Sequence, residues 1–114
     1  GGLRGGLIWW GLNITSSTPL ASATDNVATT NAVDTGSQAV SGPLVWVAIT
    51  GVNSVTSLTV TWSQGTEDRD VTYSGGRTIS GASALDANGL SSETISATYS
   101  GATTLPSLAW VALS

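Results

Sequence analysis

The sequence predicts an all-β protein: an antiparallel β-sandwich or small jelly roll of about seven to nine short strands, with an extended N-terminal arm. Three observations predict this class. Apolar residues alternate with serine or threonine in several runs, turn signals separate those runs, and residues that favour helices are scarce. The 114 residues, 40% of them hydrophobic, are enough for one domain with a buried core.

The clearest predicted strands have a strict two-residue period. Residues 57–62 have the sequence Ser-Leu-Thr-Val-Thr-Trp, residues 94–99 have Thr-Ile-Ser-Ala-Thr-Tyr, and the shorter run 70–73 has the same period. Because successive side chains of a strand point to opposite faces, each run should bury its apolar side chains and expose its hydroxyls. The 17 serines and 17 threonines are then explained as the polar outer face of a sheet protein.

Two further runs are apolar at nearly every position. Residues 44–50 and 108–114 share the pattern Leu-(Val/Ala)-Trp-Val-Ala-(Ile/Leu)-(Thr/Ser), and each has a proline shortly upstream. A strand with this pattern is covered on both faces. One face would belong to the domain core, and we expect a second element or a neighbouring molecule to cover the other. Residues 7–14, Leu-Ile-Trp-Trp-Gly-Leu-Asn-Ile, are another candidate strand.

The remaining stretches are less regular. Glycine, aspartate and asparagine interrupt residues 80–90, which predicts a loop with one helical turn. Residues 15–37 are rich in serine, threonine, alanine and asparagine, and they predict a long connection that contains one edge strand. The expected organisation is an N-terminal arm over residues 1–6 and a single β-sandwich domain over residues 7–114.

The composition excludes several classes of function. The chain has no histidine and no cysteine, which rules out the usual zinc sites, a thiol nucleophile and a Ser-His relay. With only Arg4, Arg69 and Arg77 as cations, it cannot build a surface that follows phosphates, so we expect no nucleic-acid partner. No apolar run is long enough for a membrane helix, and no membrane partner is expected. We expect no enzyme, no cofactor and no metal.

Two polar clusters have ordinary explanations. Residues 67–70, Glu-Asp-Arg-Asp, predict a solvated hairpin tip between residues 58–63 and 71–73. Asn88-Gly89 is a strong turn signal, and its surroundings lack the glycine that a calcium loop needs.

The five tryptophans are more informative. Trp46, Trp62 and Trp110 lie in predicted strands and are expected in the core. Trp9 and Trp10 are adjacent, so in an extended segment they point to opposite faces, and one of them faces outward. An outward tryptophan can stack on a sugar ring or anchor a protein interface.

The glycine-rich start of the chain is a candidate contact segment. Residues 1–24 carry one arginine and no acid, whereas the rest of the chain carries seven acids and two arginines. The glycines would let the backbone lie close against the more acidic surface of a neighbouring subunit, or add to a sheet edge. The candidate interface residues are those of the arm and the tryptophan pair: Gly1, Gly2, Leu3, Arg4, Trp9 and Trp10.

In style the chain resembles the small, cysteine-free β-sandwich structural proteins of tailed-phage-like virions, of the head-decoration or fibre and tail type. The residues that carry the likeness are 42–48, 55–62 and 94–101, which are rich in serine, threonine and glycine around a few large apolar side chains. The resemblance implies a structural role in a particle, without catalysis. It carries no functional residue over to this chain.

The function expected from these observations is that of a structural, non-catalytic virion protein. It would be a capsid decoration protein or another capsid or tail component, and it would self-assemble through its N-terminal arm and apolar strands. Its partners would be other copies of itself and another structural protein of the particle. One alternative is a secreted filament or pilus subunit, at the cell surface or outside the cell, that assembles by strand addition. The other is a carbohydrate-binding module that uses an exposed tryptophan with Tyr73 or Tyr99.

Overall fold

The computed structural model describes residues 7–27, 30–54, 56–73, 76–101 and 103–114. The regular structure in these residues is entirely β-strand, which confirms the predicted class. The eight strands are β1 (Ala21–Asn26), β2 (Ala32–Ser41), β3 (Leu44–Asn53), β4 (Val60–Trp62), β5 (Thr66–Tyr73), β6 (Arg77–Asp86), β7 (Gly89–Tyr99) and β8 (Thr104–Leu113). No helix in the described part of the chain is long and apolar enough to cross a membrane.

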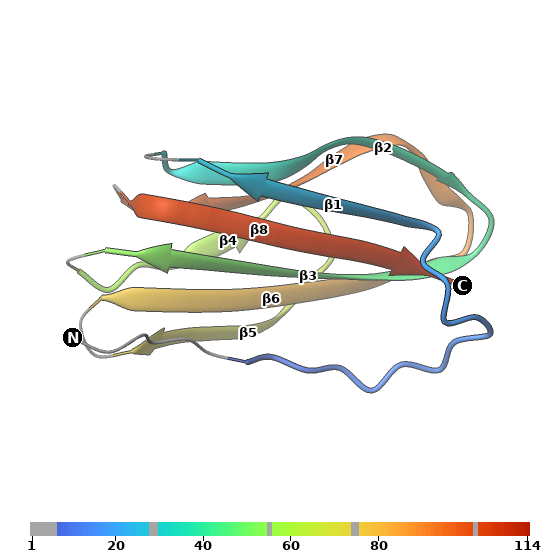
Figure 1. Ribbon diagram of the computed structural model, residues 1–114, viewed down its shortest axis with the longest axis horizontal. Helices are drawn as coiled ribbons and strands as arrows, with labels where there is room; N and C mark the ends of the chain where they lie inside the picture. Colours follow the sequence, from blue (N-terminus) through green and yellow to red (C-terminus); the bar gives the residue numbers. More distant parts are fainter. Residues whose placement is uncertain (1–6, 28–29, 55, 74–75, 102) are drawn as a thin grey trace.

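The strands form two antiparallel sheets that pack face to face. One sheet has five strands in the order β1-β8-β3-β6-β5, and the other has three in the order β2-β7-β4 (Figure 1). β3 lies at the centre of the five-stranded sheet and pairs with β6 on one side and β8 on the other. β1 and β5 are its edge strands. Residues 15–37 were predicted to contain one edge strand, but they contain two: β1 and the first part of β2, which is an edge strand of the three-stranded sheet.

Three strand pairs are nested in the chain. β1 pairs with β8, β2 with β7 and β3 with β6, always antiparallel, whereas β4 pairs with β7 and β5 with β6. Of the consecutive strand pairs, only β5 and β6 share a sheet. The other turns carry the chain from one sheet to the other. Gly42, Gly65 and Gly89 lie at three of these crossings with φ values of 84°, 80° and 79°.

Two predictions about loops and turns were wrong. Residues 80–90 are not a loop with a helical turn, because β6 continues to Asp86 and β7 begins at Gly89. The Asn88-Gly89 turn signal is confirmed, but the turn joins the two sheets and does not close a hairpin. Residues 67–70 are not a hairpin tip either, because they lie inside β5, where the edge position leaves the charged side chains in water.

The two apolar runs with the shared pattern are β3 and β8, and they pair with each other. Trp46 lies opposite Ala112, and Ala48 lies opposite Trp110. Val47 lies opposite Val111, midway between these pairs, so a local two-fold relation connects the two strands. Each tryptophan therefore has a small residue as its cross-strand neighbour, which lets both indoles fit between the sheets.

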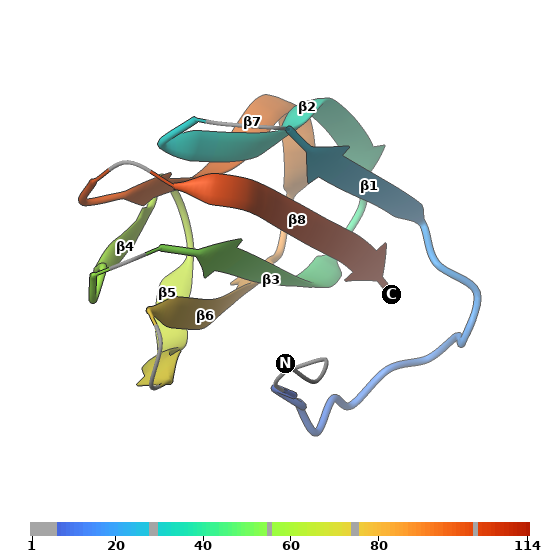
Figure 2. The same ribbon diagram turned by 60° about the vertical axis from the view of Figure 1, so that its left-hand side comes forward.

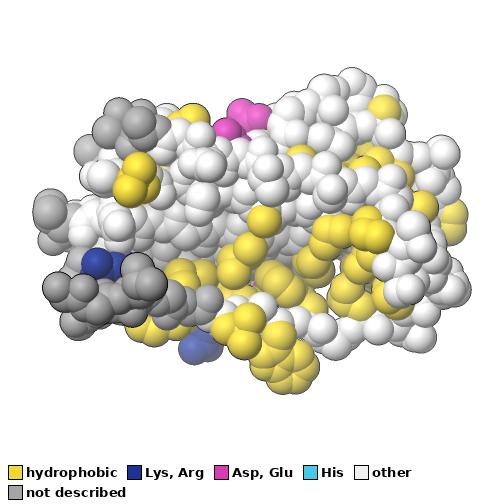
Figure 3. Space-filling view, viewed as in Figure 1, with side chains coloured by type: hydrophobic (Ala, Val, Ile, Leu, Met, Phe, Trp, Pro, Cys, Tyr) yellow, Lys and Arg dark blue, Asp and Glu magenta, His cyan; other side chains and the backbone are white. Residues whose placement is uncertain are grey.

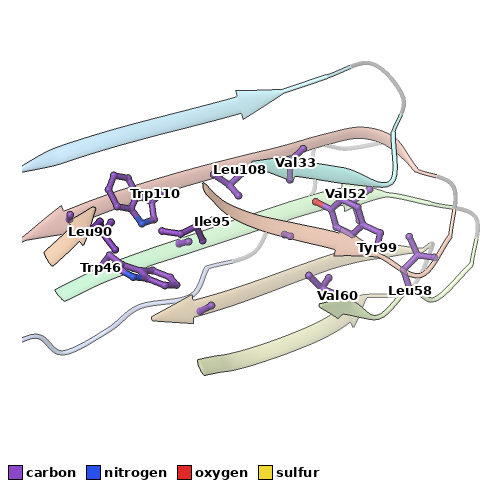
Figure 4. Packing of buried hydrophobic residues seen from close by; sticks show 14 of the residues in the cluster. Val33, Trp46, Val52, Leu58, Val60, Leu90, Ile95, Tyr99, Leu108 and Trp110 are labelled. Atoms are coloured by element: carbon purple, nitrogen blue, oxygen red, sulfur yellow. The ribbon is translucent and has the colours of Figure 1, made fainter. Parts of the chain in front are cut away.

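The core lies between the sheets and confirms the predicted burial of Leu58, Val60, Ile95, Ala97 and Tyr99. For residues 70–73 the prediction was wrong, because Tyr73 at the end of the edge strand β5 is exposed. Trp46 and Trp110 lie near Leu90 and Ile95 at one end of the core, and Tyr99 lies at the other end (Figure 4). Trp62 is half-buried at the margin of this core. The buried hydrophobic residues are Val33, Leu44, Val45, Trp46, Ala48, Val52, Leu58, Val60, Ala82, Leu90, Ile95, Ala97, Tyr99, Leu108, Trp110 and Ala112.

The hydroxyl residues do not all lie on the outer faces, as the sequence suggested. Five of them are buried, namely Thr35, Thr50, Thr78, Ser80 and Thr103. Thr50 Oγ1 accepts a hydrogen bond from the Tyr99 hydroxyl and donates one to the Ser107 carbonyl, which links β7 to the opposite sheet. Trp62 Nε1 donates to Ser80 Oγ at 2.9 Å and links β4 to β6. These bonds satisfy the buried hydroxyls and tie the two sheets together.

The Tyr99→Phe substitution is expected to lower the free energy of unfolding by about 1 kcal/mol at neutral pH, because it removes the bond to Thr50. Burial, and to a lesser extent Asp25, raises the pKa of Tyr99 above its usual 10.0, although the bond to Thr50 acts in the opposite direction. The folded state therefore favours the neutral phenol. That stabilisation is complete below about pH 10 and is lost as the pH rises through the folded-state pKa.

Urea unfolding at neutral and alkaline pH measures both effects. Tyr73→Phe is the matched control, because Tyr73 is 43% exposed. The stability of the Tyr99→Phe variant should fall less above pH 10 than that of the wild type. If the wild type and the Tyr99→Phe variant lost the same stability above pH 10, the raised pKa would not belong to Tyr99.

Candidate assembly surface

Residues 7–20, here called the N-terminal segment, run along the five-stranded sheet without forming a strand. The prediction of a strand at residues 7–14 was therefore wrong. The segment is held by side-chain contacts at its start and by backbone bonds near its end, where Thr15 N and Ser16 N donate to Ser114 O and Leu20 N donates to Ala112 O. Between these attachments the chain bows away from the strands (Figure 2).

Trp9 and Trp10 point to opposite sides, as their adjacency predicts. Trp9 is 79% exposed and Leu7 is 81% exposed, whereas Ile8 and Trp10 are partly buried. Trp10 and Ile8 pack on Gly81 of β6, where a Cβ atom would lie within 2.8 Å of the Trp10 ring. The outward residue of the tryptophan pair is thus Trp9.

A bulge in β5 supplies the polar partner of Trp10. The register of β5 against β6 shifts between Glu67 and Arg69, so Asp68 is the extra residue. Its carboxylate oxygen Oδ2 accepts one hydrogen bond from Trp10 Nε1 at 2.7 Å and another from Ser83 Oγ at 2.6 Å. The bulge therefore directs an edge-strand carboxylate toward the N-terminal segment.

The other predicted interface residues, Gly1, Gly2, Leu3 and Arg4, lie outside the described residues. The sequence also gave no sign of Gly81, Asp68 and Ser83, because they meet Trp10 only in the folded chain. Asp68 is 58 positions from Trp10 in the sequence. A local pattern has no means of indicating a contact over that separation.

The outer face of the five-stranded sheet is apolar at its centre. β3 and β8 direct Val47, Ile49, Ala109, Val111 and Leu113 to this side, away from the core. Figure 3 shows apolar side chains spread across the middle of this face, and the N-terminal segment covers only part of it. A shallow groove of about 390 Å³ has Ile49, Ile79 and Ala109 in its lining.

Titratable groups are few in this chain. No three histidine, cysteine or acidic side chains of the described chain gather where they could hold a metal ion. Glu67 lies on β5. Partial burial is the larger cause that raises its pKa, and the nearby Asp70 carboxylate is the smaller one. Tyr99 is 2% exposed, so the expectation that it could serve as a sugar platform is wrong. Tyr73 is exposed at the end of β5.

Comparisons of the chain with protein-family models, with curated proteins and with solved structures give no match. The surface formed by the N-terminal segment and the apolar outer face offers large apolar side chains and few charges, which suits contact with another protein surface.

Proposed function

We propose that this chain is a structural, non-catalytic protein that self-assembles, and that it serves as a capsid decoration protein or another capsid or tail component of a virion. The observation that carries the proposal is the exposure of Leu7 and Trp9, together with the apolar outer face of the central strands β3 and β8. Water-exposed apolar area of this kind is a driving force for association, at about 25 cal/mol per Å² removed from water. Other copies of the chain and a further structural protein of the particle are the proposed partners.

The dimensions of the molecule suit an interface of ordinary size. Its two longest extents are 43 and 25 Å, and the five-stranded sheet covers one of the broad sides (Figure 1). A side of this size can present roughly the 800 Å² per partner that stable complexes bury. The central strands β3 and β8 contribute no charged side chain to it, so an uncharged apolar surface would be its best complement.

The nested pairing of the strands supports the proposed role in a virion. Eight strands wound so that the first pairs with the last, the second with the seventh and the third with the sixth favour a jelly-roll interpretation. Viral capsid proteins use that architecture, and so do lectins and cupins. The link from this architecture to a virion is an analogy, because a fold does not by itself fix a function.

The two alternatives have less support. A filament subunit that adds a strand to a neighbour needs an open sheet edge. One of the four edge strands, β5, carries Glu67, Asp68, Arg69 and Asp70, which protect that edge from pairing. A carbohydrate-binding module would use Trp9, whose ring is free to stack on a sugar. Titration of tryptophan fluorescence with polysaccharides tests that alternative, and an unchanged signal would count against it.

Light scattering, with negative-stain imaging of the same sample, tests the proposed function. Wild-type protein should form closed assemblies that grow with concentration. Trp9→Glu should weaken assembly by about tenfold or more in concentration, because it places a charge where the apolar ring would be buried. Thr98→Glu is the matched control, because it places the same charge on an exposed site of the three-stranded sheet. A wild-type monomer at every concentration would contradict self-assembly, and open fibres would favour the filament alternative.

A further inference from the structure

Gly81 lies directly under the side chains by which the N-terminal segment docks on the sheet. A Cβ atom at this position would lie 2.8 Å from Cζ2 of Trp10 and 3.0 Å from Cδ1 of Ile8, so both side chains rest directly on the glycine. Asp68 holds the indole from the side through the 2.7 Å bond to Nε1, and Ser83 holds Asp68. Gly81, Asp68 and Ser83 together are called the socket below.

The chain that follows the docked residues has the character of a hinge. No atom lies within 4 Å of the position that a Cβ on Gly11 would take, and Asn13 and Ile14 are exposed. Within the described chain, the next backbone bond from the segment to the sandwich is made by Thr15. Residues 11–14 therefore connect two attached regions, and Leu12 is the one residue among them that is partly buried. Figure 2 shows this part of the chain standing away from the sheet.

An open surface hollow of about 430 Å³ is bounded by residues 7–11 and by Asp68 and Arg69 of β5. The start of the N-terminal segment is therefore bordered by solvent on this side. The contact is specific at the socket, whereas Trp9 and Leu7 make little contact with their own chain.

We propose that residues 7–10 of one copy occupy the socket of a second copy when the protein assembles. This inference rests on the self-assembly of the proposed function and names the contact that performs it. Exchange between copies keeps the Trp10–Asp68 bond and the packing on Gly81, because the same residues meet in either case. The hinge at residues 11–14 lets the segment reach outward.

Two full-length variants, each defective in one half of the contact, test the exchange. Gly81→Val fills the socket but keeps the docking side chains. The atoms that valine would displace are the side-chain tips of Ile8 and Trp10, so β6 itself should be undisturbed. The double variant Ile8→Ser with Trp10→Ser keeps the socket but removes the docking side chains. Each variant alone should stay monomeric, and native mass spectrometry should show about tenfold more dimer in their mixture than in either sample.

Thr98→Val is the matched control for the filled socket. Thr98 is exposed on β7 of the three-stranded sheet, so this change also places a valine on a strand, but away from the proposed assembly surface. This variant should assemble as the wild type does. A mixture that yields no dimer, or a Gly81→Val sample that assembles normally, would overturn the exchange. A wild type that assembles while the mixture fails would leave the proposed function standing, which separates the two proposals.

Discussion

Replacing Trp46 with alanine is expected to lower the free energy of unfolding by about 3–5 kcal/mol. Trp46 is 1% exposed, and it fills the space between the sheets beside Leu90 and Ile95 (Figure 4). Its ring also lies against the backbone at Gly65, where a Cβ atom would be only 2.5 Å from Cη2. No neighbouring strand can move into the emptied space without breaking sheet pairing, so much of the cavity should remain. Small domains have about 5–15 kcal/mol in total, so the loss would leave this variant near its unfolding threshold.

Denaturant unfolding followed by circular dichroism measures this effect. Trp9→Ala removes the same side chain from a position that is 79% exposed, and it should change the stability by less than about 0.5 kcal/mol. Equal losses in both variants would contradict the burial difference between the two tryptophans.

Replacing Gly89 with alanine is expected to cost about 2–5 kcal/mol, through two effects that add. A positive φ of 79° is unfavourable for any residue with a Cβ, by about 1–2 kcal/mol. The new Cβ would also lie 2.2 Å from the Val40 carbonyl oxygen and 2.8 Å from that of Gly42, and these backbone atoms cannot move without disturbing the β2–β3 turn. Overpacking of this kind costs a further 1–3 kcal/mol or so.

Gly42→Ala separates the two effects. Its φ is 84°, similar to that of Gly89, but no atom lies within 4 Å of its Cβ position. This variant should lose only about 1–2 kcal/mol. If thermal and denaturant unfolding gave the two alanine variants the same stability, the clash at Gly89 would have been relieved and the prediction would be wrong.

The alternating strands could be predicted because a two-residue period is a local property. Residues 94–99 bury Ile95, Ala97 and Tyr99 as the pattern indicates. Residues 80–86 could not be recognised in this way, because their small residues have weak strand preference. They form a strand because β6 is paired on both sides, with β3 and with β5.

The candidate site was predictable only in part. The opposite directions of Trp9 and Trp10 follow from the geometry of any extended chain. The socket could not be predicted in this way, because the role of Gly81 depends on which side chain lies above it in the folded chain. The acidic run at residues 67–70 was correctly expected in water, but its position in an edge strand, with Asp68 directed at Trp10 by the bulge, required the fold.

The pairing of Trp46 with Ala112 and of Ala48 with Trp110 also protects the chain against misfolding. In most sheets, a strand that slips by one residue turns its apolar side chains into water, and this penalty fixes the alignment. β3 and β8 are apolar on both faces, so that penalty is weak for them. A slip by two residues, however, would place Trp46 directly opposite Trp110, with more volume than the space between the sheets can hold. Alternating large and small residues thus select a single alignment where hydrophobicity alone would tolerate several.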